Sequence, residues 1–115
     1  MAISFAPAVG YAARAPQFVT LADFDKDGKL DAATVSFSGD ASVLLGNGNG
    51  TFQPERTYMS TANVPGTAIV AADFNNDGNP DLAFSMSTYG FGTLLGNGDG
   101  TFRRFTHQLP CFHEQ

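Results

Sequence analysis

The sequence predicts an all-β fold of short antiparallel strands, and three observations lead to that prediction. Phe and Gly are abundant, with 11 and 13 copies in 115 residues, which suits strands joined by glycine turns. Two long stretches recur at one constant offset, which indicates a repeat architecture. No long window shows the apolar period of an amphipathic helix. The chain is 43% hydrophobic, which is enough for a folded core.

The repeat has a period of 50 residues. Ala22–Gly28 recurs as Ala72–Gly78, and Leu44–Phe52 recurs as Leu94–Phe102. A period of this size is typical of solenoids, propellers and arrays. A shorter echo, Phe5-x-Pro7 followed by Tyr11, matches Phe52-x-Pro54 followed by Tyr58. We therefore expect an outer strand of a preceding or neighbouring unit at 1–16, the first repeat at 17–60, the second at 61–107 and an atypical tail at 108–115.

Each repeat is predicted to contain four strands. In chain order, the strands of the first repeat are expected at 18–22, 32–37, 42–45 and 51–58, and those of the second at 67–71, 82–86, 91–95 and 101–106. The Gly-Asn-Gly-x-Gly stretches before the fourth strands are predicted hairpin loops, because Gly and Asn tolerate positive φ. Pro54 lacks the N–H that a central strand donates, which predicts that the fourth strand lies at the sheet edge.

Most of the acidic residues are concentrated between the first and second strands of each repeat. Seven of the eleven Asp and Glu residues lie in the windows 23–31 and 73–81. The first window reads Asp-x-Asp-x-Asp-Gly-x-x-Asp and the second Asp-x-Asn-x-Asp-Gly-x-x-Asp. A bound cation would relieve the repulsion. Six to eight oxygen ligands suit Ca²⁺, whereas Zn²⁺ prefers nearby His or Cys. The alternative is a pair of plain turns, because Asp and Asn bond their own backbone.

These loops differ from the helix-flanked calcium loop of the EF-hand. That loop closes with a bidentate Glu at position 12, whereas Thr34 and Phe84 occupy this position here. Predicted strands replace the flanking helices, and the last acid stands at position 9. The glycine at position 6 permits a sharp turn, and the backbone carbonyl at position 7 can add a ligand.

The two halves of the repeat together resemble the FG-GAP/VCBS family, which is similar to the calcium-binding blades of integrin α-subunit propellers and of some propeller lectins. The resemblance covers roughly 17–105, although a literal Phe-Gly…Gly-Ala-Pro signature is absent. It implies four-stranded β-propeller blades with two structural Ca²⁺ ions per chain. The predicted ligands are Asp23, Asp25, Asp27, Asp31 and the Lys29 carbonyl in the first loop, and Asp73, Asn75, Asp77, Asp81 and the Asn79 carbonyl in the second.

Composition argues against several other classes of protein. The net charge of −5 disfavours binding to nucleic acid or to anionic lipid. No apolar run approaches a membrane span, and the N-terminal residues do not read as a signal peptide. Cys111 alone makes neither an intrachain disulfide nor a zinc motif. Bare Asp clusters suit millimolar calcium, so we expect an extracellular or secreted protein.

Three functions remain open from the sequence. The first is a module for adhesion or for glycan or protein recognition, as the resemblance implies, with Tyr11, Tyr58 and Tyr89 as possible sugar platforms. The second is a purely structural repeat of a larger secreted protein. The third, an enzyme, is disfavoured, because the two histidines lie at the end of the second repeat (His107) and in the atypical tail (His113), and no nucleophile motif is present.

Two blades are too few for a closed propeller. Propellers close with about four to eight blades, and repeat stacks generally need at least three units. We therefore expect the chain to pair with other propeller blades. A homo-oligomer of three or four chains is the specific hypothesis, and a piece of a longer protein is the alternative.

Overall fold

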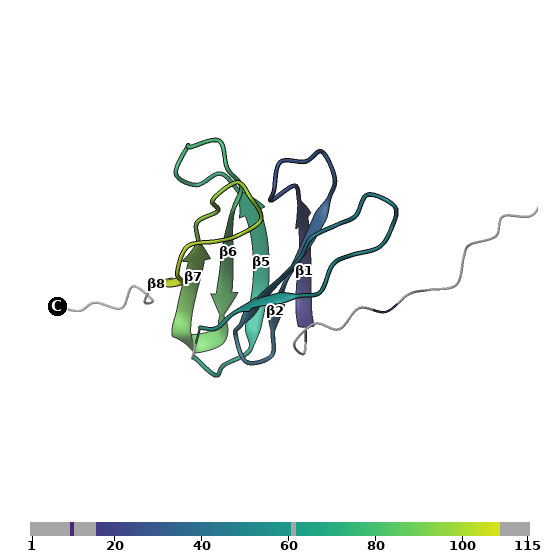
Figure 1. Cartoon of the computed structure of the whole chain (residues 1–115). Helices are drawn as coiled ribbons and strands as arrows, with labels where there is room; N and C mark the ends of the chain where they lie inside the picture. The colour runs from purple at the N-terminus through teal and green to yellow at the C-terminus, as the bar shows by residue number, and fades with distance from the viewer. Residues whose placement is uncertain (1–9, 11–15, 61, 109–115) are drawn as a thin grey trace, which may run out of the picture.

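The computed structural model describes residues 10, 16–60 and 62–108, which fold as two antiparallel β-sheets standing side by side (Figure 1). Sheet 1 has the strand order β1-β2-β3-β4 and sheet 2 the order β5-β6-β7-β8. The strands are β1 (Pro16–Ala22), β2 (Asp31–Ser36), β3 (Ala41–Leu44), β4 (Arg56–Tyr58), β5 (Gly66–Ala72), β6 (Asp81–Met86), β7 (Gly90–Leu94) and β8 (Thr106–Gln108).

The expectation of an all-β fold is confirmed. In the described part of the chain the helical content is a single 3₁₀ turn, Ser87–Tyr89, between β6 and β7. Every strand pair within a sheet is antiparallel, and consecutive strands are neighbours. The boundaries of the first three strands of each repeat differ from the predicted ones by one or two residues.

The fourth strands begin later than predicted. They were expected from Thr51 and Thr101, but the structure places β4 at Arg56–Tyr58 and β8 at Thr106–Gln108. Phe52 and Phe102 instead form isolated bridges with Gly46 and Gly96, just beyond the ends of the third strands. Pro54 cannot donate a ladder hydrogen bond, which accounts for the interruption in sheet 1. Sheet 2 has the same interruption, although Arg104 stands there in place of a proline. Proline alone therefore does not explain why the fourth strands begin late.

Two predicted segments fall almost entirely outside the described residues. Of the outer strand expected at 1–16, the structure describes residues 10 and 16, and Pro16 is the first residue of β1. The tail expected at 108–115 overlaps them at Gln108, which is the last residue of β8.

The core lies between the two sheets. Apolar side chains from β2 and β3 pack against apolar side chains from β5, β6 and β7. The buried cluster consists of Phe24, Ala33, Val35, Ala41, Val43, Ile69, Leu82, Phe84, Met86, Leu94 and Phe102. Phe24 and Phe102 meet edge to face with ring centroids 5.4 Å apart, so the cluster extends from the strands into the loops.

The two Asp-rich connections, β1–β2 and β5–β6, lie at the same end of the sheets (Figure 1). The backbone just after each third strand lies very close to the backbone of the Asp-rich connection in the same sheet. A Cβ atom on Gly46 would lie 2.0 Å from the Leu30 carbonyl oxygen, and one on Gly96 would lie 2.0 Å from the Pro80 carbonyl oxygen. Glycine therefore lets the third strand approach the Asp loop at backbone distance.

Candidate metal centre

The two Asp loops have nearly the same backbone conformation. Position 4 has positive φ in both loops, 61° at Lys26 and 61° at Asn76. The glycine at position 6 also has positive φ, 85° at Gly28 and 86° at Gly78. This confirms the predicted turn at position 6, and it shows a second turn at position 4 that the sequence pattern did not predict.

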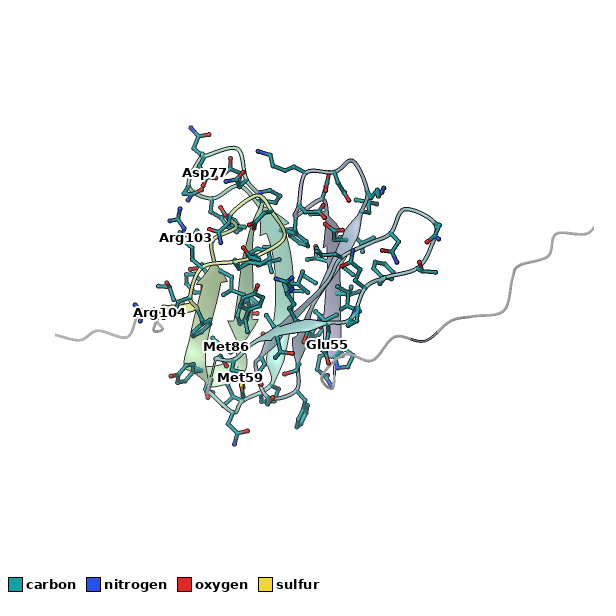
Figure 2. The ribbon with its side chains drawn as sticks, viewed as in Figure 1. Glu55, Met59, Asp77, Met86, Arg103 and Arg104 are labelled. Atoms are coloured by element: carbon teal, nitrogen blue, oxygen red, sulfur yellow. The ribbon has the colours of Figure 1, made fainter. Side chains whose placement is uncertain are left out.

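The first Asp of each loop closes the turn by accepting backbone hydrogen bonds. Asp23 accepts from the N–H of Asp27 at 3.2 Å and from the N–H of Gly28 at 2.7 Å. Asp73 accepts from the equivalent groups at 3.2 and 2.8 Å. The two carboxylates are thereby held at the inside of their loops. Figure 2 labels Asp77, which belongs to the second of these loops.

The last Asp of each loop is fully buried and connects three parts of its sheet. The two oxygens of Asp31 accept from the N–H of Phe24 at 2.8 Å and from the N–H of Gly46 at 2.7 Å. Asp81 accepts from the N–H groups of Phe74 and Gly96, both at 2.8 Å. This aspartate therefore joins the Asp loop, the second strand and the end of the third strand. Each oxygen keeps a further lone pair, so the hydrogen bonds leave room for a metal contact.

The structure brings most of the predicted ligands together. Oxygens of three carboxylates lie within 4.8 Å of one another in each loop, and the groups are Asp23, Asp25 and Asp27 in the first and Asp73, Asp77 and Asp81 in the second. The N–H of Lys29 donates to Asp27 and the N–H of Asn79 to Asp77, so position 7 also lies next to the cluster. The carbonyls of Lys29 and Asn79 and the Asp31 carboxylate remain predicted ligands.

Asp25 lies in an environment that disfavours its ionised form. Its Oδ1 atom is buried and has no hydrogen-bond partner among the described residues. Burial and, after it, the neighbouring carboxylates of Asp27, Asp31 and Asp23 raise the pKa of Asp25 to about 6. A desolvated carboxylate beside other carboxylates is costly when ionised, and a cation in the loop would remove that cost.

The pKa values of two other loop carboxyls, Asp23 and Asp77, are shifted in the opposite direction. Burial raises the pKa of Asp23, but the backbone N–H groups of Gly28 and Asp27 outweigh it and lower that pKa overall. At Asp77 the N–H of Asn79 lowers the pKa. Hydrogen bonds to the charged form thus keep these two carboxylates ionised and available as ligands.

Asn75 replaces Asp25 in the second loop and faces the other three ligands. With its amide nitrogen turned inward, it donates to Asp73 at 3.1 Å, to Asp77 at 2.9 Å and to Asp81 at 3.2 Å. With its carbonyl oxygen turned inward, four oxygens converge on one point. The second arrangement has the donor set of a calcium loop, and the first satisfies the same carboxylates without a cation.

The residues present fit a calcium ion. All predicted side-chain ligands offer oxygen atoms, three carboxylates gather in each loop, and Asp25 has a buried oxygen that a cation would satisfy. Calcium accepts such a set of carboxylate and carbonyl oxygens with flexible geometry. Zinc fits less well, because the clustered ligands include neither His nor Cys.

Contacts between the two repeats were missed by the sequence reasoning. The Nζ atom of Lys26 donates to Asn79 Oδ1 at 3.0 Å, and the N–H of Gly100 donates to the Phe24 carbonyl at 3.2 Å. These bonds join the first Asp loop to sheet 2. The one available signal was Phe24 itself, an apolar residue inside an acidic loop, which packs inward and is 1% exposed.

The Gly-rich loops are turns held by their own polar side chains. Gly48 and Gly50 have φ values of 84° and 90°, as the predicted hairpin loops require. Asn47 donates to the Thr51 hydroxyl at 2.9 Å, and Asn49 accepts from the Thr51 N–H at 3.1 Å. In the second repeat the Thr101 hydroxyl, followed by the Thr101 N–H, lowers the pKa of the equivalent Asp99.

Two similar antiparallel sheets, each with an acidic strand-flanked loop, define an all-β repeat protein. Comparison with protein families gives the particular family: the FG-GAP-like repeat model matches residues 23–84. That match spans more than half of the chain, and the chain belongs to this family. No curated protein matches the sequence. Within the described residues, no helix is long and apolar enough to cross a membrane.

Proposed function

We propose that the chain is a calcium-binding β-propeller repeat module whose two Asp loops each hold one Ca²⁺. The observation that carries this proposal is a cluster of carboxylate oxygens in each of the two equivalent loops, with a buried Asp25 oxygen in the first that has no hydrogen-bond partner among the described residues. Membership in the FG-GAP-like family supports it, since such repeats often bind calcium. Each sheet is then a blade, and the ion lies at the same end of both.

The proposed role of calcium is structural. In the first loop Asp23, Asp25 and Asp27 would hold the ion, and in the second Asp73, Asp77, Asp81 and the Asn75 carbonyl. When bound, the ion supplies positive charge that offsets the carboxylate repulsion. The protein supplies the rest, because Asp31 and Asp81 already tie each loop to its third strand. An ordered loop then fixes the angle at which the first strand enters the sheet.

Calcium counting tests the proposal directly. Native mass spectra of the full chain with calcium, and again after chelation, should show two Ca²⁺ per chain that chelation removes. Asp23→Asn and Asp73→Asn should each reduce the count by one. Asp99→Asn is the matched control, because Asp99 is an acid outside both Asp loops and should leave two ions bound. A chain that retains no calcium at millimolar concentration would contradict the proposal.

For the wider role we propose an extracellular or secreted setting and recognition of a glycan or protein. The family supports this setting, because FG-GAP repeats are typical of extracellular proteins. The alternative is a structural repeat without a ligand of its own. One observation favours that alternative: Tyr58 packs on Phe102 with centroids 5.6 Å apart and its hydroxyl accepts from the Phe102 N–H at 3.2 Å. Tyr58 therefore serves the contact between the sheets.

A glycan array separates these two roles. Binding of the calcium-loaded chain to a defined set of glycans, lost when Tyr89→Ala is tested, supports recognition through an aromatic platform. An array without signal supports the structural alternative. We propose no catalytic role, because carboxylates committed to a cation remain ionised and do not transfer protons. Turnover of a glycoside substrate would contradict that part of the proposal.

A further inference from the structure

The 50-residue repeat relates the faces of the two sheets to one another. Strand pairing places Ala33, Val35, Ala41 and Val43 on the face of sheet 1 that contacts sheet 2, which we call inner face 1. Alternation places Val19, Leu21, Ala32, Thr34 and Leu44 on the opposite side, outer face 1. In sheet 2, inner face 2 contains Ile69, Leu82, Phe84 and Leu94, and outer face 2 contains Val70, Ala83, Ser85 and Phe91.

Each outer face is the repeat equivalent of the inner face on the other sheet. Outer face 2 corresponds by sequence offset to inner face 1, since Ala83 is equivalent to Ala33 and Ser85 to Val35. Outer face 1 corresponds to inner face 2 in the same way, since Leu44 is equivalent to Leu94. The packing of the two sheets within the chain can therefore be repeated between outer face 2 of one copy and outer face 1 of another.

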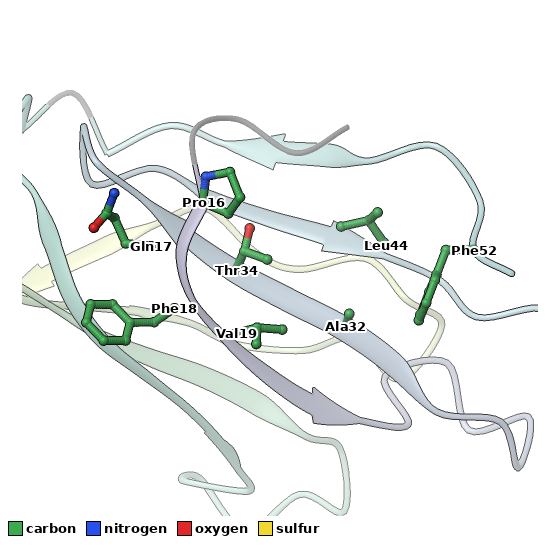
Figure 3. Close-up of a pocket in the computed structure, with 8 residues that line it drawn as sticks. All are labelled: Pro16, Gln17, Phe18, Val19, Ala32, Thr34, Leu44 and Phe52. Carbon is green, nitrogen blue, oxygen red and sulfur yellow. The ribbon is translucent and has the colours of Figure 1, made fainter. Parts of the chain in front are cut away.

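Both outer faces are apolar and hollowed. Val19 and Leu21 on outer face 1 are 62% and 56% exposed, and Val70 and Phe91 on outer face 2 are 53% and 46% exposed. A cavity of about 330 Å³ on outer face 1 is lined by Val19, Ala32, Thr34, Leu44 and Phe52, among others (Figure 3). Thr34 Oγ1 is buried there without a hydrogen-bond partner among the described residues. A second cavity of about 310 Å³ lies on outer face 2 beside Val70, Ala83 and Phe91.

The sizes of the side chains on the two outer faces are complementary. Inside the chain, small Ala41 on inner face 1 belongs to the same buried cluster as large Phe84 on inner face 2. On the outer faces the sizes are exchanged, because Phe91 is the equivalent of Ala41 and Thr34 is the equivalent of Phe84. At this pair of positions, large Phe91 on outer face 2 would therefore meet small Thr34 on outer face 1, as Phe84 and Ala41 pair a large with a small residue within the chain.

The Asp loops provide a second, independent observation. Phe24 in the first loop is 1% exposed, because it packs on Phe102 of the following sheet. Its equivalent in the second loop, Phe74, is 49% exposed. The residue equivalent to Phe102 is Phe52, which lines the cavity on outer face 1. Phe74 thus has the environment that Phe24 would have if no sheet followed it.

We propose that a second copy of this chain packs outer face 2 onto outer face 1, with Phe74 of one copy against Phe52 of the next. Such a contact is head to tail, so it leaves one outer face open at each end and continues until the rotation closes a ring. The inference extends the proposed blade role, but it uses the sheet packing alone and does not need calcium.

Cross-linking between two single-cysteine variants tests the contact. In a Cys111→Ser background, Phe74→Cys and Phe52→Cys are prepared separately, mixed, and treated with a short bismaleimide. The head-to-tail contact predicts covalent dimers in the mixture and almost none with either variant alone. Dimers from Phe74→Cys alone would mean a symmetric contact and would overturn the proposal. Absence of dimers in the mixture, with both variants folded by circular dichroism, would also overturn it.

Sedimentation velocity over a concentration series provides the second test. The chain should sediment as an oligomer larger than a dimer, and Phe74→Ser should shift it to monomer. Phe37→Ser is the matched control: Phe37 is 60% exposed but lies in the β2–β3 turn, away from both outer faces, so it should leave the oligomer intact. If the wild-type chain is a monomer at all concentrations, the proposal is overturned, and a second copy of the chain does not cover outer face 1. Two bound Ca²⁺ on such a monomer would leave the proposed calcium function intact.

Discussion

At the scale of single residues, the two Asp loops differ most at position 3, where Asp25 corresponds to Asn75. Ligand charge sets calcium affinity over several decades, so the loop with Asp at position 3 should bind calcium more tightly than the loop with Asn there. Asn75→Asp should strengthen binding to the second loop by roughly tenfold, and Asp25→Asn should weaken binding to the first by a similar factor. Isothermal titration calorimetry at constant ionic strength measures both. Affinities that do not respond to either exchange would place position 3 outside the coordination shell.

The raised pKa of Asp25 predicts a dependence of stability on pH in the absence of calcium. Its folded pKa of about 6 lies above the ordinary value of 3.8, so the folded state binds the proton more tightly between these values. The free energy of unfolding should therefore rise as pH falls through 6 towards 4. Below about 4 it should fall again, because the lowered pKa values of Asp23, Asp77 and Asp99 make protonation unfavourable in the folded state.

Urea unfolding in calcium-free buffer from about pH 2.5 to 7 measures this dependence. Asp25→Asn lacks the titrating carboxyl and should remove the gain between pH 6 and 4 while keeping the loss below 4. A wild-type chain whose stability only decreases as the pH is lowered from 7 would contradict the predicted role of Asp25.

At the scale of the loop and its strands, Asp31 is the connection whose loss should matter most. Its two oxygens accept from Phe24 and Gly46, and the side chain is fully buried. An Asn at this position would point an amide N–H₂ at one of these donors. That one buried N–H would then be unsatisfied, which costs about 1–3 kcal/mol. Thermal unfolding of Asp31→Asn in calcium-free buffer measures the loss, with Asp99→Asn as an exposed control that should change little.

The glycine at the end of the third strand makes a separate prediction at this scale. Gly46→Ala would place a Cβ atom 2.0 Å from the Leu30 carbonyl oxygen, so the Asp loop must move. We expect a destabilisation of about 1–3 kcal/mol, as for other overpacked sites. Gly10→Ala is the matched control, because no atom of the described residues lies within 4 Å of its Cβ position. Equal stability of the two variants in urea would show that the loop adapts without cost.

At the scale of the whole molecule, calcium should stabilise the sheets because it binds the folded loops and not the unfolded chain. The stabilisation is about 2.7 kcal/mol for each site when calcium is a hundredfold above Kd. Scanning calorimetry should show a melting temperature that rises with calcium concentration, and the Asp23→Asn, Asp73→Asn double variant should show no rise. Magnesium at the same concentration should raise it less, since it prefers a stricter octahedron.

Much of the fold was predictable from local sequence. The periodic strands, the Gly turns and the offset of 50 identified an all-β repeat protein and the order of strands within each sheet. The fourth strands were placed too early, because Thr51 and Phe52 have strand-forming side chains, yet Phe52 forms only an isolated bridge before Pro54. The spacing of the acids predicted that carboxylates gather in each loop, and three do in each, whereas Asp31 stays a predicted ligand of the first loop.

The sequence by itself determined the local features: the strand pattern, the positive-φ turns at glycine and the oxygen-rich character of both loops. These features are local, because they depend on the backbone preferences and the side-chain oxygen atoms of residues that are close together in the sequence. The tertiary structure alone decided that Asp31 bonds Gly46 across 15 residues and that Lys26 reaches Asn79 across 53. It also decided that Phe24 is buried whereas Phe74 is exposed, although each follows the first Asp of its loop. That difference arises because burial depends on the sheet packed alongside, and no local pattern records it.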